Sequence, residues 1–123
     1  MTIEQVIRET DELKPNTYSE AHKIRWLSRV DAMVKRLILD PHKGADQIKF
    51  RGYDETTPRD TVLLVPEPYD EMYGAYLRAQ IDYHNREFDP YNNEIETFHA
   101  VFGAYGDDYR SRHSSAGPAD FRW

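Results

Sequence analysis

The chain has 123 residues, a formal net charge of −6 and no cysteine, which suits a single domain and excludes disulfides, zinc–thiolate sites and thiol nucleophiles. The acidic balance disfavours a dedicated nucleic-acid binder or a protein of anionic membrane surfaces, because both need clustered cations. No run of about 18 apolar residues is present and the acidic N-terminus is unlike a secretory leader, so we expect a soluble protein made inside the cell.

The first predicted helix spans residues 2–14. Thr2 and Gln5 have the spacing of a capping box, and Pro15 ends the helical pattern. Apolar residues recur at three- and four-residue spacing, which places them on one helix face. They are Ile3, Val6, Ile7 and Leu13.

A second helix is predicted from residue 20 to residue 39. Ser19 is a good N-cap, and the Asp40-Pro41 step ends the helix because a residue before proline avoids helical backbone angles. The apolar positions step by threes and fours along its length. They are Ile24, Leu27, Val30, Val34, Leu37 and Ile38.

Residues 40–68 form the least regular part of the chain. The segment holds four prolines and two glycines, so a long loop is predicted. Within it, residues 47–51 alternate polar and apolar, and residues 61–65 are a short β-branched run, so we predict two short extended pieces that pair with each other. A connection this long in so small a domain often carries function.

Helical periodicity returns at residues 69–88, with two apolar stripes that predict a central helix buried on much of its circumference. Asp89-Pro90 is predicted to break it, and Asp89 or Asn92 to cap a fourth helix that reaches about Tyr109. The fourth helix carries a heptad-like aromatic seam, and the contact between these two helices is predicted to form the core. The seam consists of Tyr91, Ile95, Phe98, Phe102, Tyr105 and Tyr109.

Residues 112–123 have the composition of a flexible C-terminal tail, which ends in Phe121 and Trp123. Because disordered termini usually lack aromatic residues, we expect this tail to dock on another surface. The predicted architecture is therefore all-α: one domain over residues 1–111, built as a small bundle of about four helices with a long irregular loop, and an extended tail.

Candidate chemistry is sparse. Asp82, His84, Glu87 and Asp89 invite a metal interpretation, but Asp82 and His84 do not share a helix face, and a solvated face or an interhelical polar network is favoured. Asp40, His42 and Asp46 surround Gly44 without the spacing of a calcium loop.

His99 beside the aromatic seam fits a structural role better than acid–base chemistry. The serines of residues 111–115 lack a nucleophile turn, and no glycine-rich phosphate loop is present. We therefore expect no catalytic residue, no cofactor and no metal.

Six segments of the chain have a distinctive sequence. They are DELKPN (11–16), KIRWLS (23–28), PYDEMY (68–73), YLRAQIDYHN (76–85), EFDPYNN (87–93) and FHAVF (98–102). These segments resemble a family of short proteins from Firmicutes phages and prophages, and the resemblance covers most of the sequence apart from residues 40–60 and the tail. In size and helix order that family is similar to head–tail connector (head-completion adaptor) proteins of long-tailed phages.

The resemblance implies a structural virion protein at the head–tail interface, made in the host cytoplasm. Such subunits are helical bundles that form a ring, commonly a dodecamer in the virion, between the portal protein and tail-side completion proteins. Their loops and tails reach neighbouring subunits or the portal, and none of their residues is catalytic. DNA passes through without specific binding, which the net charge of −6 suits because an acidic lumen repels phosphates.

Composition agrees with assembly. Ile, Leu, Val and Phe account for only 25 of the 123 residues, so we expect the chain to complete its burial against copies of itself or a partner. The loop and the tail supply the candidate interaction residues, which are Phe50, Tyr53, Val62, Leu64, Phe121 and Trp123.

Two other functions stay open at this point. One is a phage-encoded regulatory module that binds a host protein, and the other is a small metal-dependent enzyme that uses His84, His99 and nearby carboxylates. Gene position among capsid and tail genes or among early genes would separate the connector from the regulator, and metal analysis would test the enzyme.

Overall fold

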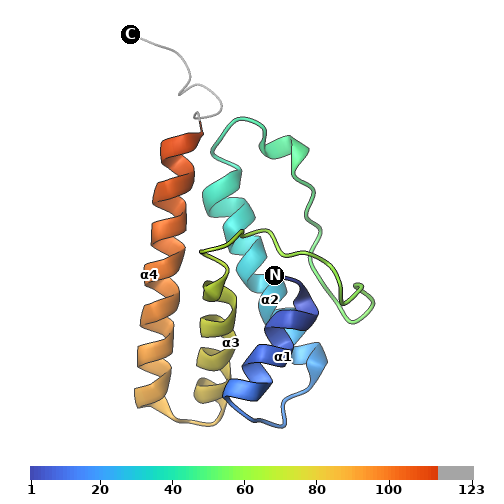
Figure 1. Cartoon of the computed structure of the whole chain (residues 1–123), viewed down its shortest axis with the longest axis vertical. Coiled ribbons are helices and arrows are strands. Elements are labelled where there is room, and N and C mark those ends of the chain that lie inside the picture. The colour runs from blue at the N-terminus through green and yellow to red at the C-terminus, as the bar shows by residue number, and fades with distance from the viewer. Residues whose placement is uncertain (114–123) are drawn as a thin grey trace.

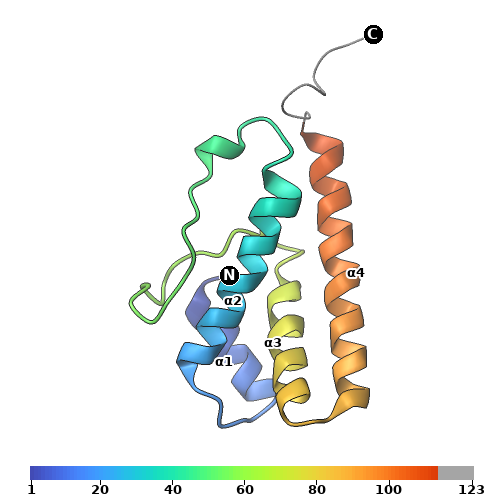
Figure 2. The same ribbon diagram turned by 180° about the vertical axis from the view of Figure 1, so that it is seen from behind.

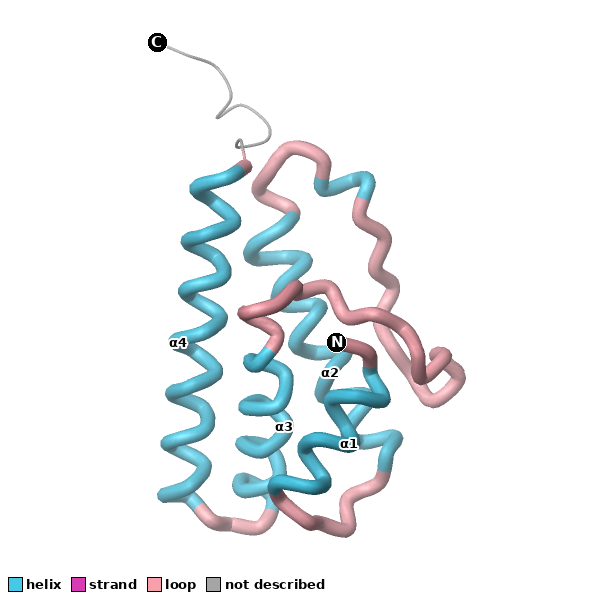
Figure 3. Tube along the Cα trace, in the orientation of Figure 1, coloured by secondary structure: helices cyan, strands magenta, loops and turns pink. Residues whose placement is uncertain are grey.

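The structure, a computed structural model, describes residues 1–113 and contains four α-helices and no strand within them (Figure 1, Figure 3). It confirms the all-α prediction. The short segments η1 and η2 are π-helical and 3₁₀-helical turns. The elements in chain order are α1 (Ile3–Leu13), α2 (Glu20–Val34), η1 (Lys35–Leu39), η2 (Ala45–Gln47), α3 (Glu71–His84) and α4 (Phe88–Arg112).

Helix α3 is the central element, as the sequence predicts, because α1, α2 and α4 all pack against it. The middle of the loop of residues 40–70 lies on the side of the bundle away from α4 in both views (Figure 1, Figure 2). The ends of the loop return to α4, where His42 contacts Tyr109 and Tyr69 contacts Tyr105. Helix α1 lies in front of α2 in Figure 1 and behind it in Figure 2, so these two helices occupy opposite faces.

The predicted helix starts are confirmed at α1 and α2. The Thr2 backbone N–H donates to Gln5 Oε1 over 2.9 Å, and the Gln5 N–H donates to Thr2 Oγ1 over 3.2 Å, which completes the capping box. Ser19 Oγ accepts the His22 N–H over 3.2 Å at the start of α2. These side chains satisfy backbone donors that the first helical turn leaves without partners.

The second predicted helix continues to residue 39, but its last turn is π-helical. The Asp40 N–H donates to the Lys35 carbonyl over 2.8 Å, five residues earlier. This wider turn buries the adjacent residues Ile38 and Leu39 and leaves Leu37 exposed.

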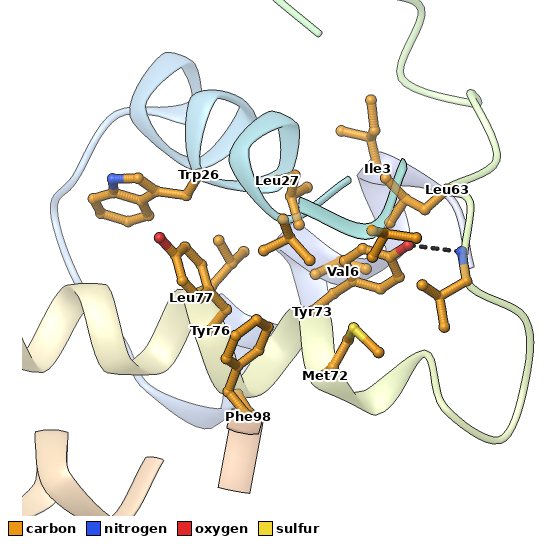
Figure 4. Packing of buried hydrophobic residues seen from close by; sticks show 14 of the residues in the cluster. Ile3, Val6, Trp26, Leu27, Leu63, Met72, Tyr73, Tyr76, Leu77 and Phe98 are labelled. Carbon is orange, nitrogen blue, oxygen red and sulfur yellow. Dashed lines mark hydrogen bonds between the residues drawn. The ribbon is translucent and has the colours of Figure 1, made fainter. Parts of the chain in front are cut away.

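The core lies mainly between α3 and the pair α1 and α2, with a smaller contribution from α4 (Figure 4). The sequence analysis predicts that the contact between the third and fourth helices forms the core. In the structure this contact forms only one side of the core, and three residues of α4 are buried: Phe98, Tyr105 and Tyr109. Large side chains that are almost wholly inaccessible include Ile3, Ile24, Leu27, Met72, Tyr73, Leu77 and Ile81.

The predicted pairing of residues 47–51 with residues 61–65 is wrong. Gln47 ends the 3₁₀ turn η2, and neither segment forms a strand within the described part of the chain. Val62 instead makes an isolated antiparallel bridge with Thr2. The Ile3 N–H donates to the Thr61 carbonyl over 3.0 Å and the Leu63 N–H to the Met1 carbonyl over 2.9 Å, so the N-terminus takes the backbone partners expected of the other segment.

The break between the third and fourth helices falls earlier than Asp89-Pro90 predicts. The Glu87 N–H donates to the Asp82 carbonyl and the Arg86 N–H to the Tyr83 carbonyl, with Arg86 at a φ of 61°. These two bonds form a Schellman motif, which ends α3. Pro90 falls in the first turn of α4, where a missing N–H costs nothing, and Asp89 lies inside the helix instead of capping it.

Helix α4 runs three residues beyond the predicted end at Tyr109, to Arg112. The ring of His113 stacks on Tyr109, with centroids 3.7 Å apart and planes 7° apart. The expected docking of the tail through Phe121 and Trp123 concerns residues outside the described part of the chain.

Two tyrosines of α3 provide a matched test of the core. Tyr76 is 7% exposed and packs against Phe98, with ring centroids 5.0 Å apart, whereas Tyr83 is 51% exposed. Tyr76→Ala should lower the free energy of unfolding by about 3–5 kcal/mol, because it leaves a cavity. Tyr83→Ala should cost below about 1 kcal/mol. Urea denaturation measures both, and equal losses would contradict this packing.

Candidate interaction site

The loop aromatics predicted as interaction residues contact each other and the helical body. The rings of Phe50 and Tyr53 meet edge to face with centroids 5.1 Å apart, and both side chains are half-buried. The Tyr53 N–H donates to Ser28 Oγ over 2.9 Å, and its hydroxyl donates to Asp31 Oδ2 over 2.5 Å. Tyr53 therefore anchors this part of the loop to α2.

Gly52 makes this anchor possible. Its φ is 90°, in the left-handed region that favours glycine, and a Cβ at this position would lie 3.3 Å from Ser28 Oγ. A side chain at residue 52 would strain the backbone and crowd the hydroxyl that accepts the Tyr53 N–H.

The two predicted residues at the end of the loop have different surroundings. Leu64 is half-buried against the core, and its N–H donates to Asp31 Oδ2 over 3.1 Å. Val62 is 68% exposed beside its bridge to Thr2. Among the predicted residues that the structure describes, Val62 is the most available to a partner.

Asp31 joins these contacts into one polar site. Its side chain is 0% exposed, yet both carboxyl oxygens are hydrogen-bonded. Oδ2 accepts from the Tyr53 hydroxyl and the Leu64 N–H, and Oδ1 accepts from the Tyr73 hydroxyl of α3 over 2.6 Å. The Tyr73 hydroxyl also accepts the Val65 N–H over 2.8 Å, the dashed line in Figure 4. One carboxylate thus connects α2, α3 and two separate parts of the loop.

Burial governs the electrostatics of this site. It raises the pKa of the Asp31 carboxyl above its ordinary value of 3.8, against the opposing effect of the hydrogen bonds from Tyr53, Tyr73 and Leu64. Burial and the nearby Asp31 charge also raise the pKa of both tyrosine hydroxyls. The tyrosines therefore stay protonated and keep donating at all ordinary pH values.

The sequence analysis does not single out Asp31, although a signal is present. Asp31 follows Leu27 by four residues and precedes Val34 by three, so it lies on the apolar stripe of its helix. An acidic residue on a buried stripe needs donors, and the nearby tyrosine-rich segments can supply them.

Of the acidic residues considered for a metal site near the end of α3, Asp82 takes part in an interhelical ion pair, whereas Glu87 and Asp89 are exposed. Asp82 is buried and pairs through Oδ1 with Lys14, which follows α1. Lys23 of α2 is buried and pairs with Asp11 of α1 over 2.7 Å. Within residues 1–113, no group of three or more histidine, aspartate or glutamate side chains is arranged to hold a metal ion.

The candidate histidines contact aromatic rings instead of one another. His84 is exposed and stacks on Trp26, with centroids 5.8 Å apart and planes 10° apart. His99 contacts Phe98 edge to face on α4. His42, considered for a calcium loop, is buried against Tyr109. The structure does not bring His84 and His99 into one constellation with carboxylates.

Comparisons of the chain with protein-family models, curated proteins and solved structures found no match. Among the described residues, no helix combines the length and the apolar character that crossing a membrane requires.

The two tyrosines at Asp31 should differ in their contribution to stability. Tyr73→Phe removes a charge-assisted hydrogen bond and also leaves the buried Val65 N–H without an acceptor, so it should cost about 3 kcal/mol. Tyr53→Phe removes one bond at a half-buried position and should cost about 1–2 kcal/mol. Chemical denaturation of the two variants measures the difference, and a larger loss for Tyr53→Phe would be inconsistent with this site.

The raised pKa of Asp31 predicts a specific pH dependence. Because the folded state holds the proton more tightly than the unfolded state, the contribution of Asp31 is fully present below pH 3.8 and decreases as pH rises through the folded pKa. The unfolding free energy of the native protein, minus that of Asp31→Asn, should therefore fall from about pH 4 upward and then level off.

Asp54 provides a control of opposite sign. Hydrogen bonds from Thr56 lower the pKa of its carboxyl, so its contribution is present above pH 3.8 and is lost as pH falls. The same difference measured with Asp54→Asn should rise with pH. A flat profile for Asp31→Asn would rule out the proposed burial effect.

Proposed function

We propose that this protein is a structural virion protein, a head–tail connector subunit that assembles into a ring beneath the portal and joins the head to the tail. The proposal starts from the resemblance of residues 11–28 and 68–102 to short phage and prophage proteins similar to connectors. The phage origin, the ring and the portal partner all belong to this proposal.

The observation that carries the proposal is the Asp31 site. An adaptor must present a segment outside its body in a fixed position, because binding by an unfixed segment loses free energy to ordering. Tyr53 and Leu64 tie the two ends of an exposed stretch to one buried carboxylate. Between them lies a run of mostly exposed residues that ends at Val62.

The surface charge supports the same role. The net charge of −6 favours passage of DNA without binding, since phosphates are repelled from an acidic surface. The aromatic seam of α4 is only partly buried, with Phe102 and Ile95 half-exposed. Aromatic residues at a half-exposed surface are favoured in protein interfaces.

Electron microscopy of the purified protein mixed with the portal ring encoded beside it tests the proposal. We expect an added ring of density on the tail-facing side of the portal.

Truncation after His113 keeps every residue that the structure describes and should leave the melting temperature unchanged while lowering portal binding. Absence of binding by the full chain would refute the connector, and unchanged binding after truncation would exclude a role for the tail.

A further inference from the structure

Two helices carry exposed surfaces of opposite charge. The outer side of α2 and η1 has a shallow groove of about 470 Å³ that is lined by Arg29, Ala32, Met33, Arg36 and Leu37. Leu37 is 59% exposed, although a large aliphatic side chain gains from burial. Within residues 1–113, neither arginine has an ion-pair partner.

The outer side of α1 is the acidic counterpart. Glu9 and Glu12 line a groove of about 460 Å³ together with Glu67, Asp70 and Arg8, and Arg8 is paired with Glu4. Within residues 1–113, neither Glu9 nor Glu12 has an ion pair. Leu13 follows Glu9 by one helical turn and is 63% exposed. This face therefore also combines free charges with an exposed leucine.

The two faces have a similar spacing of charged and apolar residues. Across α2 and η1, Met33 precedes Leu37 by four residues and Arg29 precedes Arg36 by seven. On α1, Glu9 precedes Leu13 by four residues, with Glu12 beside them. The face of α2 and η1 thus presents Met33 and Leu37 beside two arginines, and the face of α1 presents Leu13 beside two glutamates. The charges are positive on α2 and negative on α1, so the two faces complement each other.

The faces belong to helices on opposite sides of the molecule (Figure 1, Figure 2). One molecule cannot bring them together, and a two-fold dimer would pair each face with itself and place like charges in contact. A head-to-tail arrangement pairs unlike faces, and it extends from copy to copy until a ring closes.

We propose that the basic face of α2 and η1, formed by Arg29, Met33, Arg36 and Leu37, binds the acidic face of α1, formed by Glu9, Glu12 and Leu13, of a second copy of this chain. The inference rests on the proposed function, because it names the contact through which the ring forms. Leu13 and Leu37 meet at the centre of this contact, and the arginines and glutamates surround them.

Charge reversal tests the pairing. Arg29→Glu with Arg36→Glu, or Glu9→Lys with Glu12→Lys, places like charges in contact and should weaken self-association at least tenfold in sedimentation velocity at low salt. The quadruple variant restores unlike charges and should recover it. A mixture of the two double variants offers the native pairing at one contact and the reversed pairing of the quadruple variant at the next, so it should also regain self-association, whereas each double variant alone should not.

Cysteine cross-linking tests the geometry, because the chain has no cysteine of its own. The variant with Leu13→Cys and Leu37→Cys, treated with a short bismaleimide, should give a ladder of covalent oligomers in concentrated solution or on the portal ring. Each single-cysteine variant is the matched control and should stay monomeric. Dimers from Leu37→Cys alone would show a two-fold contact and overturn the proposal.

The outcomes separate this contact from the connector function. Portal binding with a ring of density but no Leu13–Leu37 cross-link would overturn the contact and leave the connector in place. Failure of the quadruple variant to regain self-association would also overturn it. Monomers in every condition, with no portal binding, would overturn both proposals.

Discussion

The carboxylate of Asp31 is the constraint on which the rest of the structure depends. A charge that is removed from water needs several donors, and those donors must approach from different directions. Here they come from Tyr53 and Leu64 in the loop and from Tyr73 at the centre of α3. Tyr53 and Leu64 lie in no strand or helix. The path of the loop at these two residues is therefore set by their hydrogen bonds to the buried carboxylate of Asp31.

This constraint couples stability to the presented surface. The backbone donors of Leu64 and Val65 end at Asp31 and Tyr73, while Leu63 bonds to the N-terminal residue. Consecutive residues of the loop are thus held by three different parts of the body. Val62 precedes these three residues and is exposed, and their hydrogen bonds hold it in place. The exposed part of the loop is thus positioned by groups inside the molecule.

The features that the sequence predicts correctly are those with local causes. The capping box of Thr2 and Gln5 and the N-cap of Ser19 depend on residues three apart, and helical periodicity identifies α3 as the central helix. The pairing of Val62 with Thr2 depends on a choice among distant partners, which alternation of polar and apolar residues does not encode. The end of α3 is missed because Arg86 takes a backbone conformation usually reserved for glycine.

The candidate site is predictable in part for the same reason. Aromatic and aliphatic residues of the loop are expected to make contacts, and Tyr53 and Leu64 do, but inside the molecule. Their role could be found only together with Asp31, whose place on an apolar stripe becomes informative once donors from a distant segment are known.

Net charge hides how charges are arranged on the surface. The value of −6 suits repulsion of DNA, yet it is an average over faces of opposite sign. Several described arginines are paired with carboxylates, as in Arg8–Glu4 and Arg78–Glu94. Arg29 and Arg36 have no ion pair within residues 1–113 and lie beside the exposed Leu37, and the unpaired Glu9 and Glu12 lie beside the exposed Leu13. Unpaired charges cost little in water, so folding alone does not require this segregation. The proposed contact between copies would account for this arrangement, because charge complementarity selects the unlike face and burial of the leucines stabilises the pair.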